Sequence, residues 1–194
     1  MILMKDLFGI EVKSLDNCEQ ELIDYDNDTF QFRLGRLRYL YSIPPLETKW
    51  MSLEMSYLFS EVKISYVNGL YATTIILAQS LIEQWLAQIL SDGGYDNTLK
   101  DKPDLKTIRK LLKGHKEIHP FIVNDVDKKI DKLRQIRNPF VHYRQRGDKE
   151  SLDQTALNVG KNHYSLMAEN AKDALTLVYE VLRIEIKVKS KFSD

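Results

Sequence analysis

The pattern of apolar positions changes along the chain at two consecutive prolines, Pro44 and Pro45. Proline continues neither a helix nor a central strand, so we predict a boundary after residue 49. Before it, apolar and polar residues alternate in two short runs, the spacing of strands. These runs are Phe8–Val12 and Phe30–Leu34. The acidic segment Asp16–Asp28 between them fits a short helix or a loop. Residues 1–49 are therefore predicted to form a small N-terminal appendage containing short strands.

After the prolines, apolar residues recur every three or four positions, which is the spacing of amphipathic helices. The strongest pattern, Leu70–Leu90, has a stripe wide enough for a core or a subunit interface. Asn68-Gly69 is expected to end the helix before it. Further helical patterns cover Leu105–Leu112, Val123–Ile136 and Leu166–Leu182. Residues 147–162 are predicted to be a loop, with a turn of helix at Leu152–Val159. We therefore predict a mainly α protein, with a bundle of four to five helices over residues 50–194.

The composition is that of an ordinary globular protein, with 43% hydrophobic and 29% charged residues among 194. Cys18 is the only cysteine, which excludes an intrachain disulfide and a zinc site built from several thiolates. The N-terminus lacks the pattern of a signal peptide, and no apolar run is long enough to span a membrane. These features predict a cytoplasmic location, no membrane association and no metal or other cofactor.

Charge is distributed unevenly although the net charge is zero. Residues 1–31 hold two lysines against eight acids, a net of −6. Residues 100–149 hold fifteen Lys and Arg against seven acids, a net of +8. A neutral total can therefore include a positive surface suited to a polyanion, although solvated helix faces would give the same count.

The most distinctive short motif is Arg137-Asn138-Pro139-Phe140-Val141-His142, which ends an amphipathic pattern within the basic region. In an unbroken helix, positions five apart are rotated by about 140°. Pro139 lacks an amide donor and disfavours a helical backbone at Asn138. We therefore expect a kink, or one helix ending near Arg137 and a short one beginning at Asn138. Either would allow Arg137 and His142 to converge on one pocket.

These residue types suit cleavage of RNA by its own 2′-hydroxyl. Histidine titrates near neutrality and can accept or donate the protons that this reaction moves. Arginine offers a fixed fork of donors for the phosphate charge that grows in the transition state. Arg137, Asn138 and His142 are therefore the candidate catalytic residues. Arg134, Tyr143 and Arg144 in the same basic segment are candidate substrate-binding residues.

The motif and its helical context resemble the HEPN superfamily, the R-x(4–6)-H nucleases and their inactive relatives. Asn138 fits the polar residue that this family favours after the arginine, and the Leu70–Leu90 helix resembles the long helix that precedes the motif. The resemblance implies a homodimer in which two motifs share a composite, metal-free endoribonuclease site. It also implies a toxin or an antiviral effector, with an antitoxin as a regulatory partner. Some toxin members carry a modifiable tyrosine two positions after the histidine, but here that position is Arg144.

Other readings of the same residues remain open. The motif could persist in a non-catalytic module that binds RNA, a nucleotide or a protein, or it could be purely structural. His115 and His119 have a spacing that suits zinc ligands on a helix, but Gly114 and Pro120 bracket them, so a surface loop is the better interpretation. Glu83 is either an exposed side chain or a partner for Arg137.

Overall fold

The computed structural model describes residues 15–46, 51–92, 105–114, 124–142, 148–149 and 151–192. Within these ranges every regular element is a helix. The helices are α1 (Leu15–Ser42), α2 (Leu53–Val67), α3 (Tyr71–Asp92), α4 (Leu105–Gly114), α5 (Asn124–Val141), α6 (Leu152–Val159) and α7 (His163–Phe192). The prediction of a mainly α helical bundle is confirmed.

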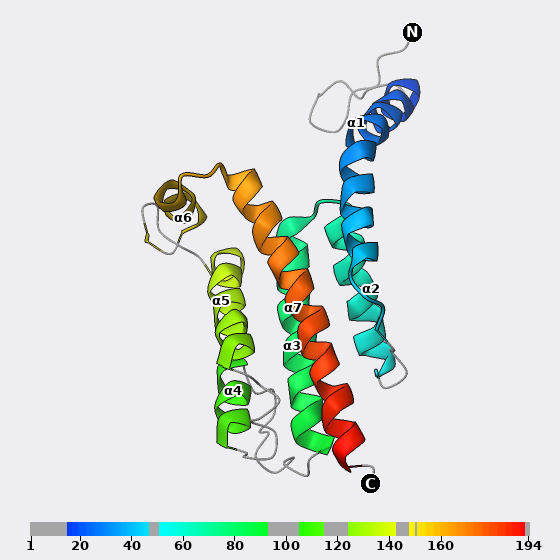
Figure 1. Ribbon diagram of the computed structural model, residues 1–194. Coiled ribbons are helices and arrows are strands. Elements are labelled where there is room, and N and C mark those ends of the chain that lie inside the picture. Colours follow the sequence, from blue (N-terminus) through cyan, green and yellow to red (C-terminus); the bar gives the residue numbers. More distant parts are fainter. Residues whose placement is uncertain are drawn as a thin grey trace, which may run out of the picture.

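Helix α3 forms the centre of the bundle. It lies beside α7, with α2 on one side of this pair and α5 on the other (Figure 1). Its buried side chains form one wide face along the helix, as the wide stripe in the sequence predicts. The largest fully buried ones are Ile75, Leu81, Ile82, Leu86 and Leu90. The core thus fixes the positions of α2, α5 and α7 relative to α3.

The N-terminal segment differs from its prediction. Residues 15–42 form one helix, so the prediction of a strand at Phe30–Leu34 is wrong. For Asp16–Asp28, where a short helix or a loop is predicted, the structure shows helix. One face of this helix carries apolar residues at the i, i+4 and i+7 spacing, namely Phe30, Leu34 and Leu37. This longer helical pattern is the better guide than the short strand-like alternation within it. The other expected strand, Phe8–Val12, lies outside the described residues.

The region after residue 50 has more helices than expected, because α2–α7 make six within the described residues. The extra one is α6, where the sequence suggests only a turn of helix. Its N-cap is Ser151, whose hydroxyl accepts from the amide of Gln154. Gly160 ends it in the left-handed conformation, at φ 65°.

Arg36 joins α1 to the turn between α2 and α3. Its Nε donates to the carbonyl of Val67 at 2.8 Å, and one Nη donates to the hydroxyl of Tyr71 at 3.1 Å. The turn itself passes through Gly69, whose φ is 77°. A Cβ on Gly69 would lie 3.2 Å from an Arg36 Nη. The absence of a side chain at position 69 therefore allows Arg36 to cap α2.

We predict that Gly69→Ala lowers the free energy of unfolding by about 1–2 kcal/mol from the left-handed backbone alone, and further by displacing Arg36. Gly160→Ala is the matched control, because Gly160 has a similar φ of 65° but nothing within 4 Å of its Cβ position. Urea unfolding of both variants measures the difference. Equal losses in the two would show that the Arg36 contact contributes nothing.

Candidate functional site

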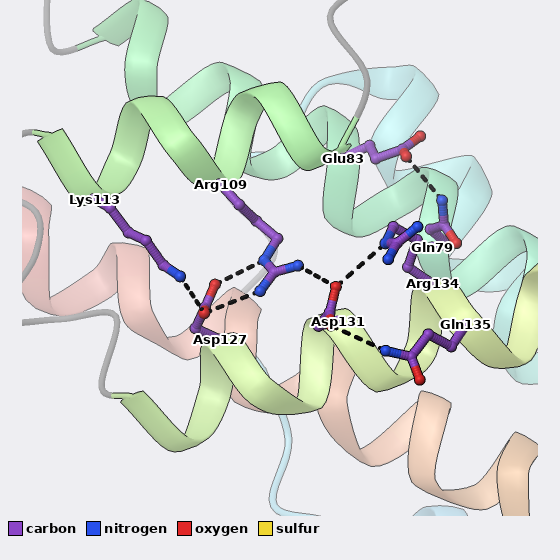
Figure 2. A network of polar contacts seen from close by, with 8 residues as sticks. All are labelled: Gln79, Glu83, Arg109, Lys113, Asp127, Asp131, Arg134 and Gln135. Atoms are coloured by element: carbon purple, nitrogen blue, oxygen red, sulfur yellow. Dashed lines mark hydrogen bonds and ion pairs between the residues drawn. The ribbon is translucent and has the colours of Figure 1, made fainter.

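Helix α4 is attached to α5 by a network of ion pairs centred on Arg109. Its Nε and one Nη donate to the two carboxylate oxygens of Asp127, at 2.7 and 3.0 Å. Its other Nη donates to Asp131, one turn further along α5 (Figure 2). A bidentate arginine of this kind fixes orientation as well as distance. The network therefore sets the position of α4 against the first half of α5.

Further residues complete this network. Lys113 lies 2.7 Å from Asp127, and Asp131 also accepts from Arg134 and Gln135 (Figure 2). The candidate substrate-binding residue Arg134 is therefore part of an internal ion-pair network. The sequence analysis missed this role, although Asp127 and Asp131 stand one helical turn apart in a basic helix.

Both carboxylates are held in the charged form. The hydrogen bonds from Arg109 lower the pKa of Asp127 more than its burial raises it. Burial acts against the charged form of Asp131, but the hydrogen bonds from Arg109 and Arg134 outweigh it, so the pKa of Asp131 is also lowered. The folded state thus favours ionised carboxylates at both positions.

The Arg137–His142 motif lies at the C-terminal end of α5. The expectation that one helix ends near Arg137 and another begins at Asn138 is wrong, because α5 continues through Pro139 to Val141. The amide of His142 still donates to the carbonyl of Asn138, at 3.0 Å. Pro139 removes the one hydrogen bond that would reach Gln135, but the helix ends two residues later. A single missing bond in the last turn is tolerated.

An unbroken helix separates the two candidate catalytic side chains. Arg137 follows Leu133 by four positions and precedes Phe140 by three, so it shares the face of α5 that packs on the core. His142, just past the helix end, is exposed and is rotated from Arg137 by about 140°. A helix that continues through Pro139 therefore does not by itself bring these two side chains together within one copy.

Arg137 differs from the other arginines of α4 and α5. Arg109 and Arg134 both pair with carboxylates, whereas Arg137 is half-buried and has no hydrogen bond or ion pair to any described residue. Glu83, for which the sequence favours an exposed side chain over a pairing with Arg137, is partly buried and accepts a hydrogen bond from Gln79 at 2.9 Å. A half-buried guanidinium without a carboxylate is suited to bind an anion from outside the chain.

Helices α5 and α7 run antiparallel and border a groove of about 370 Å³ (Figure 1). Two ion pairs cross it, Lys129 with Glu180 at 3.0 Å and Lys132 with Asp173 at 3.2 Å. These pairs neutralise the lysines on this side of α5. These two ion pairs also set how α5 and α7 are aligned, and this alignment places the motif beside the first turns of α7.

Several predicted residues cannot be placed. Tyr143, Arg144, His115 and His119 lie outside the described residues. Among the residues that are described, no group of three His, Cys, Asp or Glu side chains could hold a metal ion. None of the helices within the described ranges is long and apolar enough to cross a membrane.

Comparisons of the chain with family models, with curated proteins and with solved structures found no match. The resemblance to the HEPN superfamily therefore depends on the motif and on the order of the helices.

We predict that Asp127→Asn lowers the free energy of unfolding at pH 7 by about 2–3 kcal/mol, because it removes the carboxylate partner of Lys113 and one of the two carboxylates that bind Arg109. A lowered carboxyl pKa stabilises the fold above the ordinary value of 3.8, and this contribution is lost as the pH falls below it. The deficit of the variant should therefore shrink between pH 4 and about pH 2.

Urea unfolding across this pH range measures the effect. Asp125→Asn is the control, because Asp125 is exposed and pairs only with Lys129, so its effect should be small throughout. A deficit of Asp127→Asn that stays constant with pH would contradict the ionic origin of the effect.

Proposed function

We propose that this protein is a metal-independent endoribonuclease of HEPN type that acts as a homodimer. The observation that carries the proposal is Arg137, a half-buried arginine without a carboxylate partner among the described residues, in the polar context Arg-Asn-x-x-x-His at the end of a basic helix. By resemblance to the family, its role would be that of a toxin or an antiviral effector, with an antitoxin or another protein restraining it.

The electrostatics of α4 and α5 support binding of a polyanion. Their described residues include nine Lys and Arg against three Asp. The acids lie in or beside the ion pairs, which leaves exposed lysines on the outer faces of both helices. These lysines are Lys106, Lys110 and Lys128. Such a surface attracts RNA through its phosphates, with an affinity that falls as salt rises.

The motif supplies the groups that the chemistry needs. Arg137 would bind the scissile phosphate and stabilise its developing charge. His142 would move a proton as general acid or base, and Asn138 would hydrogen-bond the phosphate or orient the histidine. The reaction is a transfer within the RNA: the 2′-oxygen attacks phosphorus, the 5′-oxygen leaves, and a cyclic phosphate remains.

The divergence of Arg137 and His142 within one copy determines how such a site must be built. A dimer related by a twofold axis can bring Arg137 of one copy to His142 of the other. We therefore propose composite sites in which each copy supplies one of the two groups.

The second candidate is a non-catalytic module that binds RNA, a nucleotide or a protein partner with the same surface. The unbroken path of α5 through Pro139 favours it, because a single copy then offers an anion site without an adjacent general base. Binding without cleavage is its expected behaviour.

We predict that the protein cleaves RNA in the presence of EDTA and leaves cyclic-phosphate ends. Arg137→Ala and His142→Ala should each lower the rate about 10²–10⁴-fold. Arg183→Ala is the matched control for Arg137→Ala, since Arg183 is also half-buried but lies toward the other end of α7, where it donates to the carbonyl of Pro44. RNA binding without cleavage by the unaltered protein would instead support the non-catalytic module.

We also predict that mixing the two inactive variants restores activity. A heterodimer of Arg137→Ala and His142→Ala contains one intact composite site, so a random mixture should recover about a quarter of the unaltered rate. Sites built within one copy would recover nothing, and this outcome would contradict the composite arrangement.

A further inference from the structure

The N-terminal half of α1, residues 17–32, is a helical arm with large exposed apolar side chains. It extends beyond the end of the bundle, away from the other described helices (Figure 1). Leu22 is 63% exposed and Phe32 is 67% exposed, and Ile23, Tyr25 and Phe30 are exposed as well. Isolated helices of this length are marginally stable in water, so a helix with this much exposed apolar surface calls for a packing partner.

Charge is segregated along α1. The arm carries five acids and neither lysine nor arginine, a net of −5. Residues 33–42 carry three arginines and no acid, a net of +3. Two copies of such a helix attract when they lie antiparallel and repel when they lie parallel. Arg38 is exposed and has no partner among the described residues, so it is available to a second copy.

The second half of α1 also borders an apolar groove that could accommodate a helix. A groove of about 930 Å³ lies between it and α2, lined by apolar residues of both helices. These include Leu37, Leu40 and Tyr41 of α1 with Phe59, Ile64 and Val67 of α2. Lys63 is the one charged residue among the described lining residues. An apolar groove with a lysine matches an acidic helix that carries apolar side chains.

We propose that α1 pairs antiparallel with α1 of a second copy, each arm lying along the groove between α1 and α2 of its partner. A twofold axis near Phe32 would place residues 22–28 of one copy beside residues 36–42 of the other. This arrangement buries the exposed apolar residues of both arms and brings the acids of each arm to Arg38 of the other, since Arg33 already pairs with Asp26 and Arg36 with the turn after α2. Both copies use the same surface, so the contact is satisfied by two copies and does not extend into a chain.

This inference does not depend on the proposed function. Its variants leave Arg137 and His142 unchanged, so dimerisation and cleavage are measured separately.

Sedimentation equilibrium of the full chain tests the pairing. The unaltered protein should associate at micromolar concentration, and Leu22→Glu/Phe32→Glu should lower its association state by one step while the helical circular dichroism is retained. The product is the dimer that the proposed α5 contact maintains, or a monomer where that contact does not form. Leu157→Glu is the matched control, because Leu157 is 73% exposed but lies on α6. An association state that the arm substitutions leave unchanged would overturn the proposal.

Charge reversal tests the complementarity. Arg38→Glu should weaken the dimer at least about tenfold, and adding Asp24→Lys and Asp28→Lys to the same chain should restore it. Failure of the combined variant to recover would refute the assigned charge pairing.

Cross-linking tests the direction of the pair. Cys18 is exposed near the start of the arm, and antiparallel pairing places the two Cys18 residues roughly 40 Å apart. A short bis-maleimide should therefore not join them, whereas Phe32→Cys in a Cys18→Ser background should be joined. Efficient joining through Cys18 would instead indicate a parallel pair and overturn the antiparallel arrangement.

Discussion

Burial of one wide face of α3 is the constraint on which the bundle depends. Ile75, Leu81, Ile82, Leu86 and Leu90 are each at most 1% exposed, so the helices around α3 must present apolar faces to it. Helix α7 and α2 do so over long stretches, and α5 does so through Ile130 and Leu133. Helix α4 is short and buries fewer large side chains. It is attached to α5 by the hydrogen bonds from Arg109 to the carboxylates of Asp127 and Asp131. The core thus positions α5, and α5 in turn positions both the ionic network and the motif.

The sequence predicts helices well where their apolar stripe is wide. The pattern at Leu70–Leu90 corresponds to α3, and Asn68-Gly69 ends the preceding helix as expected. The prediction from sequence is wrong at Phe30–Leu34, where the structure has a helix and not a strand. Five residues of alternating character are compatible with a strand and also with part of a longer helix. The deciding contacts come from Leu40 and Tyr39, which pack on distant parts of the core. Such tertiary contacts cannot be seen in a local pattern.

Pro139 shows the same limit at the candidate site. The sequence identifies the residues of the motif, but a proline near a helix end has two outcomes with similar local cost. A new helix beginning at Asn138 would exploit the preference of proline for a first turn. A helix that continues instead loses one hydrogen bond and keeps Phe140 packed against the core. The core contact decides between them, and it keeps Arg137 on the face of α5 that packs on the core.

The charge of the basic region is likewise redistributed by the fold. Asp127 and Asp131 gather Arg109, Lys113 and Arg134 into the contact between α4 and α5, while Lys129 and Lys132 are neutralised by acids of α7. The positive surplus therefore lies on the outer lysines and on Arg137. Because Arg137 is half-buried and pairs with no carboxylate in the part of the chain that the structure describes, its charge is less screened than that of an exposed lysine. An anion that reaches the end of α5 would meet this guanidinium already in place, whether or not a histidine from a second copy completes the site.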